Sequence, residues 1–338
     1  MNLYKLIFYC TLIIGTLITI CSNSWFGMWV GLEINLLSFI PLMSDIKNSF
    51  STEASLKYFL TQALASIILL FSMISMIYHQ SYWNINIVNN NFNYMMNLTL
   101  MLKLGAAPLH FWFVEIIENM NWINSTILLI WQKIAPMIIL MNNSNTMWLM
   151  LMFIILSALM GSIMGLNQTS LQKIMAYSSI NHMSWMFTTF LFMKPFWLVY
   201  FIVYSFITIS MTFMFHILNS FTLKTLFIKM NNNPLLKFLL LMSMLSMGGL
   251  PPFLGFFPKW IIVQNMISTQ MFSLLLILIL TALISLYYYL RISLTAITLN
   301  YMEINWIQSI NFSKILPILC NCISTFGLIF LTLIYKIL

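Results

Sequence analysis

The sequence predicts an all-α membrane protein that crosses the bilayer about eleven times. Hydrophobic residues occupy 61% of its 338 positions and charged residues only 6%, whereas roughly a quarter of an ordinary soluble domain is charged. The mean hydropathy is +0.94. Apolar stretches of about 20 residues, enough to span the hydrocarbon core as a helix, recur along the chain. Residues 1–338 are therefore expected to form a single transmembrane domain.

Apolar runs separated by polar breaks mark the expected helices. Their approximate ranges are 4–21, 25–44, 57–78, 94–117, 123–141, 147–167, 172–193, 196–217, 235–269, 272–298 and 315–337. The longest connections are expected over residues 79–93 and 218–234. We expect two five-helix repeats, residues 1–146 and 147–300, followed by a C-terminal helix within residues 301–338.

The lysines support this arrangement and predict an orientation, because membrane proteins retain basic loops in the cytoplasm or an equivalent compartment. The loops expected on the side of the N-terminus carry Lys5, Lys47, Lys57, Lys173, Lys224, Lys229, Lys237 and Lys314. The opposite side carries only Lys194 and Lys336. We therefore expect the N-terminus to face the cytoplasm or mitochondrial matrix and the C-terminus to face the opposite compartment.

Two of the expected spans contain glycine and proline near their middle: KLGAAPLHFW (103–112) in the fourth span and MGGLPPFLGFFPKW (247–260) in the ninth. Proline removes a backbone donor and clashes with the preceding turn, so both helices should be kinked or broken. Each break falls in the fourth helix of a repeat, and the odd number of helices would invert the second repeat. Paired interruptions in inverted repeats indicate a transport site near the bilayer midplane. Ordinary proline kinks are the alternative.

Four charged residues are expected well inside the spans: Glu33, Lys103, Lys133 and Lys259. A charge at a helix centre costs roughly 2.5–3.5 kcal/mol on insertion scales, and such residues usually face a polar interior and have a function. Snorkelling is the alternative for the lysines, although each lies roughly 15 Å from a span end. For Glu33 the alternative is a static buried ion pair with Lys103 or Lys133.

Together these side chains suit proton transfer. Removal from water disfavours the charged form of glutamate and of lysine, while their mutual attraction favours it, so a small change in distance or hydration can decide which group holds the proton. His110, just after the first break, and His182, in the polar run YSSINHMSW (177–185), are candidate relay groups, because imidazole accepts and donates protons near neutral pH. A purely structural hydrogen-bonding role is the alternative for each.

The sequence lacks the motifs of cofactor and metal sites. It has no GxGxxG fingerprint, no P-loop, no nucleophile elbow and no cluster with metal-ligand spacing. We therefore predict no cofactor and no metal in this chain, and we place any redox chemistry in another polypeptide. The formal charge of +8 comes from scattered basic residues without a cluster, which argues against a nucleic-acid partner.

Several stretches resemble a known family. They are SNSWFGMWVGLEINLLSFIPLM (22–43), STEASLKYFLTQALAS (51–66), LKLGAAPLHFWF (102–113), WQKIAP (131–136), GLNQTSLQKIMAYSSINHMSWM (165–186) and GGLPPFLGFFPKW (248–260). Over essentially its whole length the chain resembles the chain 2 family of mitochondrial NADH–ubiquinone oxidoreductase, the respiratory complex I, and its insect members in particular.

The resemblance implies an antiporter-like, proton-translocating subunit of the membrane arm. Such a subunit is part of H+-translocating NADH:ubiquinone reductase but holds no redox centre or substrate site itself. Glu33 and Lys103 then correspond to the coupling pair, Lys133 to the connecting lysine, and Lys259 to the exit-side lysine on the second broken helix. His110 and His182 match polar positions of the hydrated axis proposed for the family.

The resemblance also implies the surroundings of the chain. The expected location is the mitochondrial inner membrane, with the N-terminus on the matrix side and the C-terminus on the intermembrane-space side. Expected partners are neighbouring antiporter-like and small membrane-arm subunits and lipid such as cardiolipin, while FMN, iron–sulfur clusters and ubiquinone belong to other subunits. Bacterial members have three further helices at their N-terminus, so lipid or a neighbouring subunit is expected to cover the corresponding surface here.

Two other functions remain open at this level. One is a self-standing cation/proton antiporter, since related antiporter subunits share the lysines on broken helices. The other is a membrane scaffold whose buried ions only fix the register of the helices. A continuous hydrated path through the lysines would favour conduction over the scaffold.

Overall fold

The computed structural model describes residues 3–45, 48–82, 86–143, 146–230, 234–298 and 327. The described residues form helices and no strand; their one β-type pairing is an isolated bridge between Ser170 and Thr222. The chain divides into two compact units, Met1–Ser157 and Ala158–Leu338. The boundary lies within helix α8 (Met147–Gly165).

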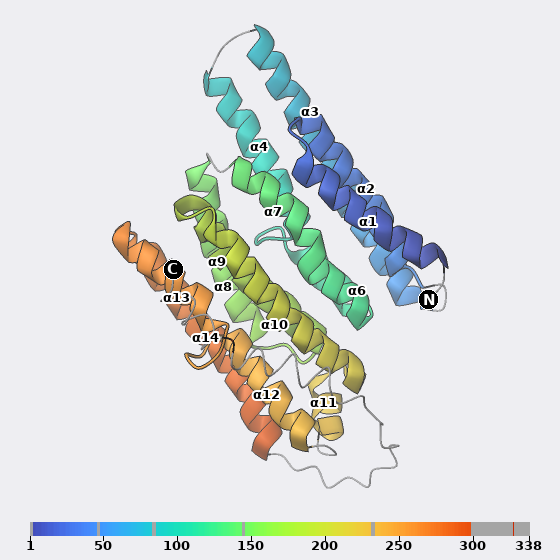
Figure 1. Cartoon of the computed structure of the whole chain (residues 1–338), viewed down its shortest axis with the longest axis vertical. Coiled ribbons are helices and arrows are strands. Elements are labelled where there is room, and N and C mark those ends of the chain that lie inside the picture. The colour runs from blue at the N-terminus through green and yellow to red at the C-terminus, as the bar shows by residue number, and fades with distance from the viewer. Residues whose placement is uncertain are drawn as a thin grey trace. The chain divides into compact units, whose positions relative to one another are not determined.

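The first unit consists of long helices that pack side by side and of shorter helical segments between them, drawn in blue to green in Figure 1. Before α8 they are α1 (Leu3–Cys21), α2 (Trp25–Met43), α3 (Ser49–Tyr82), α4 (Asn86–Leu104), α5 (Phe111–Glu118), α6 (Trp122–Thr126), the π-helical η1 (Ile127–Trp131) and α7 (Gln132–Asn142). α1 packs on α2, α2 on α3, and α3 on α4, while α7 contacts α1, α2 and α4. α7 therefore lies among several helices, and Lys133 near its start is buried.

The second unit is organised around α9 (Leu171–Phe192), which contacts α10, α13 and α14. Its other helices are α10 (Phe196–Leu218), α11 (Leu223–Met230), α12 (Pro234–Gly248), α13 (Phe256–Ser268) and α14 (Phe272–Thr298). Buried residues make up nearly all of α9, including serines, threonines, an asparagine and His182. A helix that is polar and yet buried on every side places hydrogen-bonding groups in the interior of the unit.

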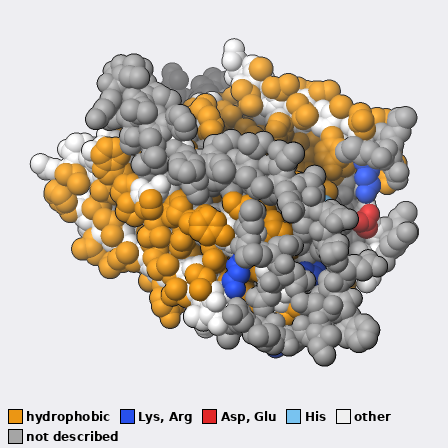
Figure 2. Space-filling model, turned by 60° about the horizontal axis from the view of Figure 1, so that its bottom comes forward, with side chains coloured by type: hydrophobic (Ala, Val, Ile, Leu, Met, Phe, Trp, Pro, Cys, Tyr) orange, Lys and Arg blue, Asp and Glu red, His pale blue; other side chains and the backbone are white. Residues whose placement is uncertain are grey.

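Seven helices in the described part of the chain are long and apolar enough to cross a membrane. They are Tyr4–Cys21, Trp25–Met43, Ser49–Tyr78, Trp122–Asn142, Met147–Leu166, Phe196–Leu218 and Phe272–Thr298. Their outer faces carry large exposed hydrophobic side chains, such as Leu60, Leu64 and Phe71 on one face of α3. Hydrophobic side chains cover most of the described surface on the face drawn in Figure 2. Such a surface suits lipid or another membrane protein better than water.

Both glycine- and proline-containing segments interrupt their helices, as predicted: α4 and α5 are separate, and so are α12 and α13. Gly105 and Gly249 directly follow the two broken ends with φ of +69° and +81°. This left-handed region is open to glycine because glycine has no Cβ. The next amides, of Ala106 and Leu250, bond back to carbonyls in the last helical turn at 3.1 and 3.4 Å. The two breaks thus use the same kind of helix terminator.

Other boundaries differ from the sequence-based ranges. α3 begins at residue 49 rather than 57, and α4 begins within the expected connection 79–93. α11 lies in the expected connection 218–234; it buries Leu226 and Met230 but is too short for the length of a membrane span. The helix expected over residues 315–337 falls outside the described residues, so the count of eleven helices stays a prediction, as do the repeat boundaries.

Candidate functional site

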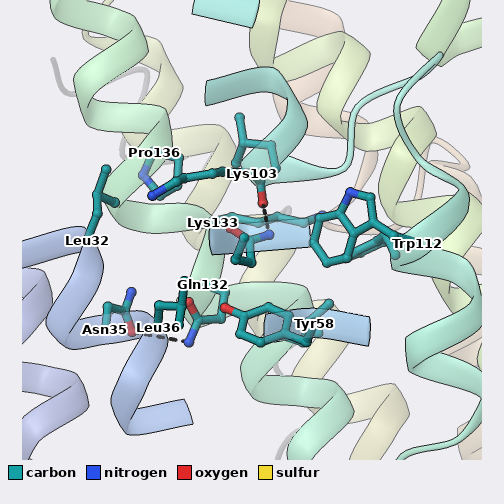
Figure 3. A pocket seen from close by; sticks show the side chains of 13 residues that line it. Leu32, Asn35, Leu36, Tyr58, Lys103, Trp112, Gln132, Lys133 and Pro136 are labelled. Carbon is teal, nitrogen blue, oxygen red and sulfur yellow. Dashed lines mark hydrogen bonds between the residues drawn. The ribbon is translucent and has the colours of Figure 1, made fainter. Parts of the chain in front are cut away.

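A small polar cavity in the first unit brings Lys103 and Lys133 together (Figure 3). The volume open to water is about 20 Å³, which is enough for one water molecule. Its polar lining consists of Asn35, Tyr58, Gln62, Lys103, Gln132 and Lys133, with Trp112 at the edge. The two lysines are only 7% and 2% exposed. Their ammonium groups therefore lie inside the unit, which excludes snorkelling to its surface.

The first helix break fixes the position of Lys103, which is the second-last residue of α4. The side chain of Gln62 donates to the Lys103 carbonyl at 3.3 Å. The indole of Trp112, from α5, donates to the Leu102 carbonyl at 3.2 Å. Carbonyls in the last turn of a helix have no intrahelical partner, so these two bonds hold the broken end of α4 against its neighbours.

Lys133 follows a π-helical turn. The backbone N–H of Gln132 bonds to the carbonyl of Ile127, five residues earlier, rather than to the residue four before it. The Lys133 ammonium lies 5.4 Å from the centre of the Phe113 ring, within the range of a cation–π interaction. In a regular helix the carbonyl of Gln132 would accept from the backbone N–H of residue 136. Residue 136 is a proline and has no N–H, so this carbonyl lacks its usual helical donor. Both residues line the cavity.

Glu33 lies near this cavity without closing an ion pair. It is close enough to Lys103 and Tyr58 to interact electrostatically with both. Its Oε1 atom is buried and has no hydrogen-bond partner among the described residues, and the ion pairs formed by those residues do not include it. The static pair with Lys103 or Lys133 is therefore not formed in this structure.

His110 is placed by the segment that links the two halves of the broken helix. It directly precedes α5, is 1% exposed, and stacks on Phe111 with ring centres 4.5 Å apart. Its Nδ1 lies 3.3 Å from the Pro108 carbonyl oxygen. His110 belongs to the same unit as Lys103 and Lys133 but does not line their cavity.

In the second unit, His182 of α9 faces two tyrosines of α10. Its Nδ1 lies 2.8 Å from the hydroxyl oxygen of Tyr200. The rings of Tyr200 and Tyr204 lie with their centres 6.1 and 5.2 Å from that of the imidazole. These tyrosines are one helical turn apart and therefore on the same face of α10. His182 thus has a buried hydroxyl as its immediate hydrogen-bond partner.

Lys259 joins the two halves of the second broken helix. It lies in the first turn of α13 and is 8% exposed, and its ammonium donates to the carbonyl of Gly248, the last residue of α12, at 3.1 Å. A Cβ at Gly249 would lie 2.9 Å from the Lys259 nitrogen. Glycine at that position therefore leaves the space that the ammonium occupies. The carbonyl end of a helix carries partial negative charge, which favours a cation there.

The structure groups some of the predicted residues and separates others. Glu33, Lys103 and Lys133 share one neighbourhood in the first unit, whereas His182 and Lys259 lie in the second unit, each with its own hydrogen-bond partner.

The sequence did not predict the neutral residues that surround these groups, which are Asn35, Tyr58, Gln62, Gln132 and Tyr200. Amide side chains inside apolar spans were the available signal, because they need partners in a membrane interior. In the part of the chain that is described, no three His, Cys, Asp or Glu residues are arranged to hold a metal ion.

Comparison with known proteins decides the family. The transmembrane family described as "NADH:quinone oxidoreductase/Mrp antiporter, TM" matches residues 22–285. The chain is 46% identical over 338 residues to NADH-ubiquinone oxidoreductase chain 2 of Anopheles gambiae, with 98% of both chains covered. It is 48% identical over 336 residues to the chain 2 protein of Aedes aegypti, again with 98% of both covered. The chain belongs to the NADH-ubiquinone oxidoreductase chain 2 family.

A solved structure agrees with this assignment at the level of the fold. A chain in respiratory complex I from Thermus thermophilus with bound aureothin superposes with a TM-score of 0.83 at 21% identity, covering 97% of this chain and 78% of that one. This chain therefore has the antiporter-like membrane fold found in complex I. The resemblance predicted from the sequence motifs is confirmed, and it makes this a multi-pass membrane protein of a mitochondrial family.

Proposed function

We propose that this chain is a proton-translocating membrane subunit of mitochondrial NADH:ubiquinone oxidoreductase, and that it moves protons while electrons are transferred in other subunits. One observation carries the proposal: Lys103 and Lys133, both buried, line a single cavity with room for water, and Glu33 lies nearby without an ion pair. Two buried amines that share a water site beside a carboxylate can pass a proton between them. Membership in the chain 2 family and in a proton-antiporter-like family supports the same function.

In this mechanism the carboxylate of Glu33 controls the charge on Lys103. When Glu33 approaches, the ammonium is stabilised and Lys103 holds its proton. When Glu33 withdraws, the buried ammonium loses that stabilisation and releases the proton through the cavity toward Lys133. Lys259 serves as the exit-side lysine, and His110 and His182 as relay groups.

The decisive experiment replaces Lys103 with methionine in the assembled complex. We expect the number of protons moved per electron to fall by the whole contribution of this chain, while assembly and NADH oxidation persist. Lys57→Met is the control, because that lysine is 40% exposed in its side chain and pairs with Glu53 and Glu115 at the surface. An unchanged proton-to-electron ratio in Lys103→Met would overturn conduction and leave the scaffold role.

The finer topology is part of the proposal. We place eleven spans in two inverted repeats, with the N-terminus in the matrix and the C-terminus in the intermembrane space. The lysine distribution along the sequence supports this sidedness, and the matching glycine terminators after α4 and α12 support the repeats. Labelling of single cysteines introduced at each end, with reagents that do not cross the membrane, tests it from either side.

The proposed partners and cofactors follow from the role of this chain as a membrane subunit of the complex. We propose contacts with neighbouring antiporter-like and small membrane-arm subunits and with lipid such as cardiolipin, while FMN, iron–sulfur clusters and ubiquinone act in other subunits. The exposed apolar faces of the described helices support lateral contacts of this kind. Cross-linking within the intact complex identifies the neighbours.

A second candidate is a cation/proton antiporter that works alone, because the matching family description also names the Mrp antiporter. The full chain in liposomes with an imposed sodium gradient separates the two functions. Proton uptake driven by sodium in the absence of other subunits would favour the second candidate. The first predicts no such uptake.

A further inference from the structure

We propose that Asn35 and Gln132 are positioning residues, whose side-chain hydrogen bond fixes the rotation of the helix that carries Lys133 and so keeps this lysine at the cavity. We call this pair the amide clasp. The role of Lys133 in this inference rests on the proposed function, whereas the contacts of the amide clasp do not depend on it.

The amide clasp joins α2 to the start of α7 inside the first unit. The Gln132 Nε2 donates to the Asn35 Oδ1 at 3.1 Å, a bond drawn in Figure 3. Asn35 is 2% exposed, and both side chains line the cavity shared by Lys103 and Lys133. The next residue after Gln132 is Lys133, so any rotation of the helix at Gln132 also turns Lys133.

α6, η1 and α7 follow one another without a gap as one helical span, Trp122–Asn142, and a second bond ties this span to α2. The side chain of Asn124, in α6, donates to the carbonyl of Leu42, in α2, at 2.9 Å. The helices therefore run in opposite directions with two points of attachment: Leu42 with Asn124, and Asn35 with Gln132. For both bonds to form, Asn124 and Gln132 must point toward α2.

In a regular helix, the spacing between Asn124 and Gln132 would not let both side chains point toward α2. On α2 the two attachment points are seven residues apart, from position 35 to 42, and on the facing helix they are eight apart, from 124 to 132. At about 100° per residue, seven residues return to within roughly 20° of the same face, but eight residues end roughly 80° away. A regular helix would therefore turn Gln132 away from the side that Asn124 faces.

The π-helical turn η1 resolves the mismatch. It occupies Ile127–Trp131, between the two attachment points, and it closes with the bond from the Gln132 amide to the Ile127 carbonyl. A single π turn inserts one extra residue into an α-helix. The eight residues from Asn124 to Gln132 therefore turn as far as seven residues of a regular helix, and Gln132 points toward α2. The π turn and the amide clasp are therefore mutually dependent: each has the geometry that the other requires.

This dependence sets the position of Lys133. π-helical turns are rare and less favourable than α-helical ones, so they persist where the surroundings hold them. Without the amide clasp, relaxation to a regular helix turns everything after the bulge by about 100° relative to Asn124. Lys133 would then leave both the cavity and the Phe113 ring, which its ammonium now faces at 5.4 Å.

The first test is geometric and uses the structure of the assembled complex with Gln132→Met, which keeps the side-chain length but removes the hydrogen bond. We expect the bond between positions 127 and 132 to be replaced by regular helical bonding and the Lys133 ammonium to leave the Phe113 ring. If the π turn and the 5.4 Å contact are both retained, the amide clasp does not position Lys133, whatever the effect on pumping.

The second test measures protons moved per electron in the same complex. Gln132→Met should lower this ratio, and the exchanged pair Asn35→Gln with Gln132→Asn should recover it in part, because a bond of similar total length can form again. Adding Gln132→Met to Lys133→Met should have no further effect, since residues that act through one another are not additive. Gln264→Met, at an exposed glutamine of α13, is the control.

The outcomes separate the two proposals. A Lys133→Met complex that pumps normally would contradict the proposed function, while the structure of Gln132→Met still decides the amide clasp. An additive loss in the double variant, or normal pumping in Gln132→Met with a displaced Lys133, would contradict the positioning role while leaving conduction through Lys103 open.

Discussion

Gly161→Ala tests the close approach of α8 to α9, the buried helix that carries His182. A Cβ at Gly161 would lie 2.6 Å from the amide nitrogen of Asn181 and 2.9 Å from the carbonyl oxygen of Tyr177. Both are backbone atoms of α9, so no side-chain rotation can make room. We expect the substitution to destabilise the second unit.

The magnitude follows from the displacement that the methyl group requires. Ordinary van der Waals contact begins at 3.4 Å, so α8 must move by about 0.8 Å from its 2.6 Å approach to α9. Adding a methyl group to a well-packed interior costs about 1–3 kcal/mol, and the higher helix propensity of alanine returns at most about 1 kcal/mol. Relative to a Gly→Ala substitution that meets no neighbouring backbone, the expected loss in the free energy of unfolding is therefore about 1–3 kcal/mol.

Unfolding of the full chain in detergent, followed by circular dichroism, provides the assay. Gly248→Ala is the matched control, because a Cβ at that glycine would meet no atom closer than 3.6 Å. The control should be neutral or slightly more stable. Equal stability of Gly161→Ala and Gly248→Ala would refute the close packing of α8 against α9.

Two further substitutions test other contacts. Tyr200→Phe removes the 2.8 Å bond to His182 and should cost about 1–3 kcal/mol, because it leaves a buried ring nitrogen without this partner; Tyr287→Phe, at an exposed tyrosine, should change nothing in the same unfolding assay. Gly31→Ala places a Cβ 2.8 Å from the backbone amide of Thr19 and should cost about 1–3 kcal/mol. A midpoint of unfolding equal to that of the parent chain would contradict the contact between α1 and α2.

The membrane fold was largely predictable because it depends on local properties. Runs of about 20 apolar residues marked the long helices, and glycine with proline marked both interruptions, at Gly105 and Gly249. The short helix α11 was not predicted, because its eight residues are far fewer than the apolar run of a membrane span. The start of α3 was missed because its first turns contain serine, threonine and glutamate, although Ser51 and Ser55 are buried.

The candidate site was predictable only in its ionisable members, which are Glu33, the three lysines and the two histidines His110 and His182. Glu33 and the lysines stood out because a charge in an apolar span is costly. Asn35, Gln132 and Tyr200 did not, since neutral polar residues are common in such helices and their meaning depends on a partner in another helix. The π turn before Lys133 could not be foreseen either, because it reflects the spacing of bonds to α2 rather than a residue pattern.

The bond between the Lys259 ammonium and the Gly248 carbonyl limits how this side chain can travel. If the lysine swings away, the end of α12 loses that donor in surroundings with little water, and a bare carbonyl there costs on the order of 1–3 kcal/mol. Motion is therefore cheap only when a water molecule arrives as the amine departs, or when α12 shifts with it. Hydration of the Gly248 carbonyl and departure of the Lys259 ammonium are then coupled.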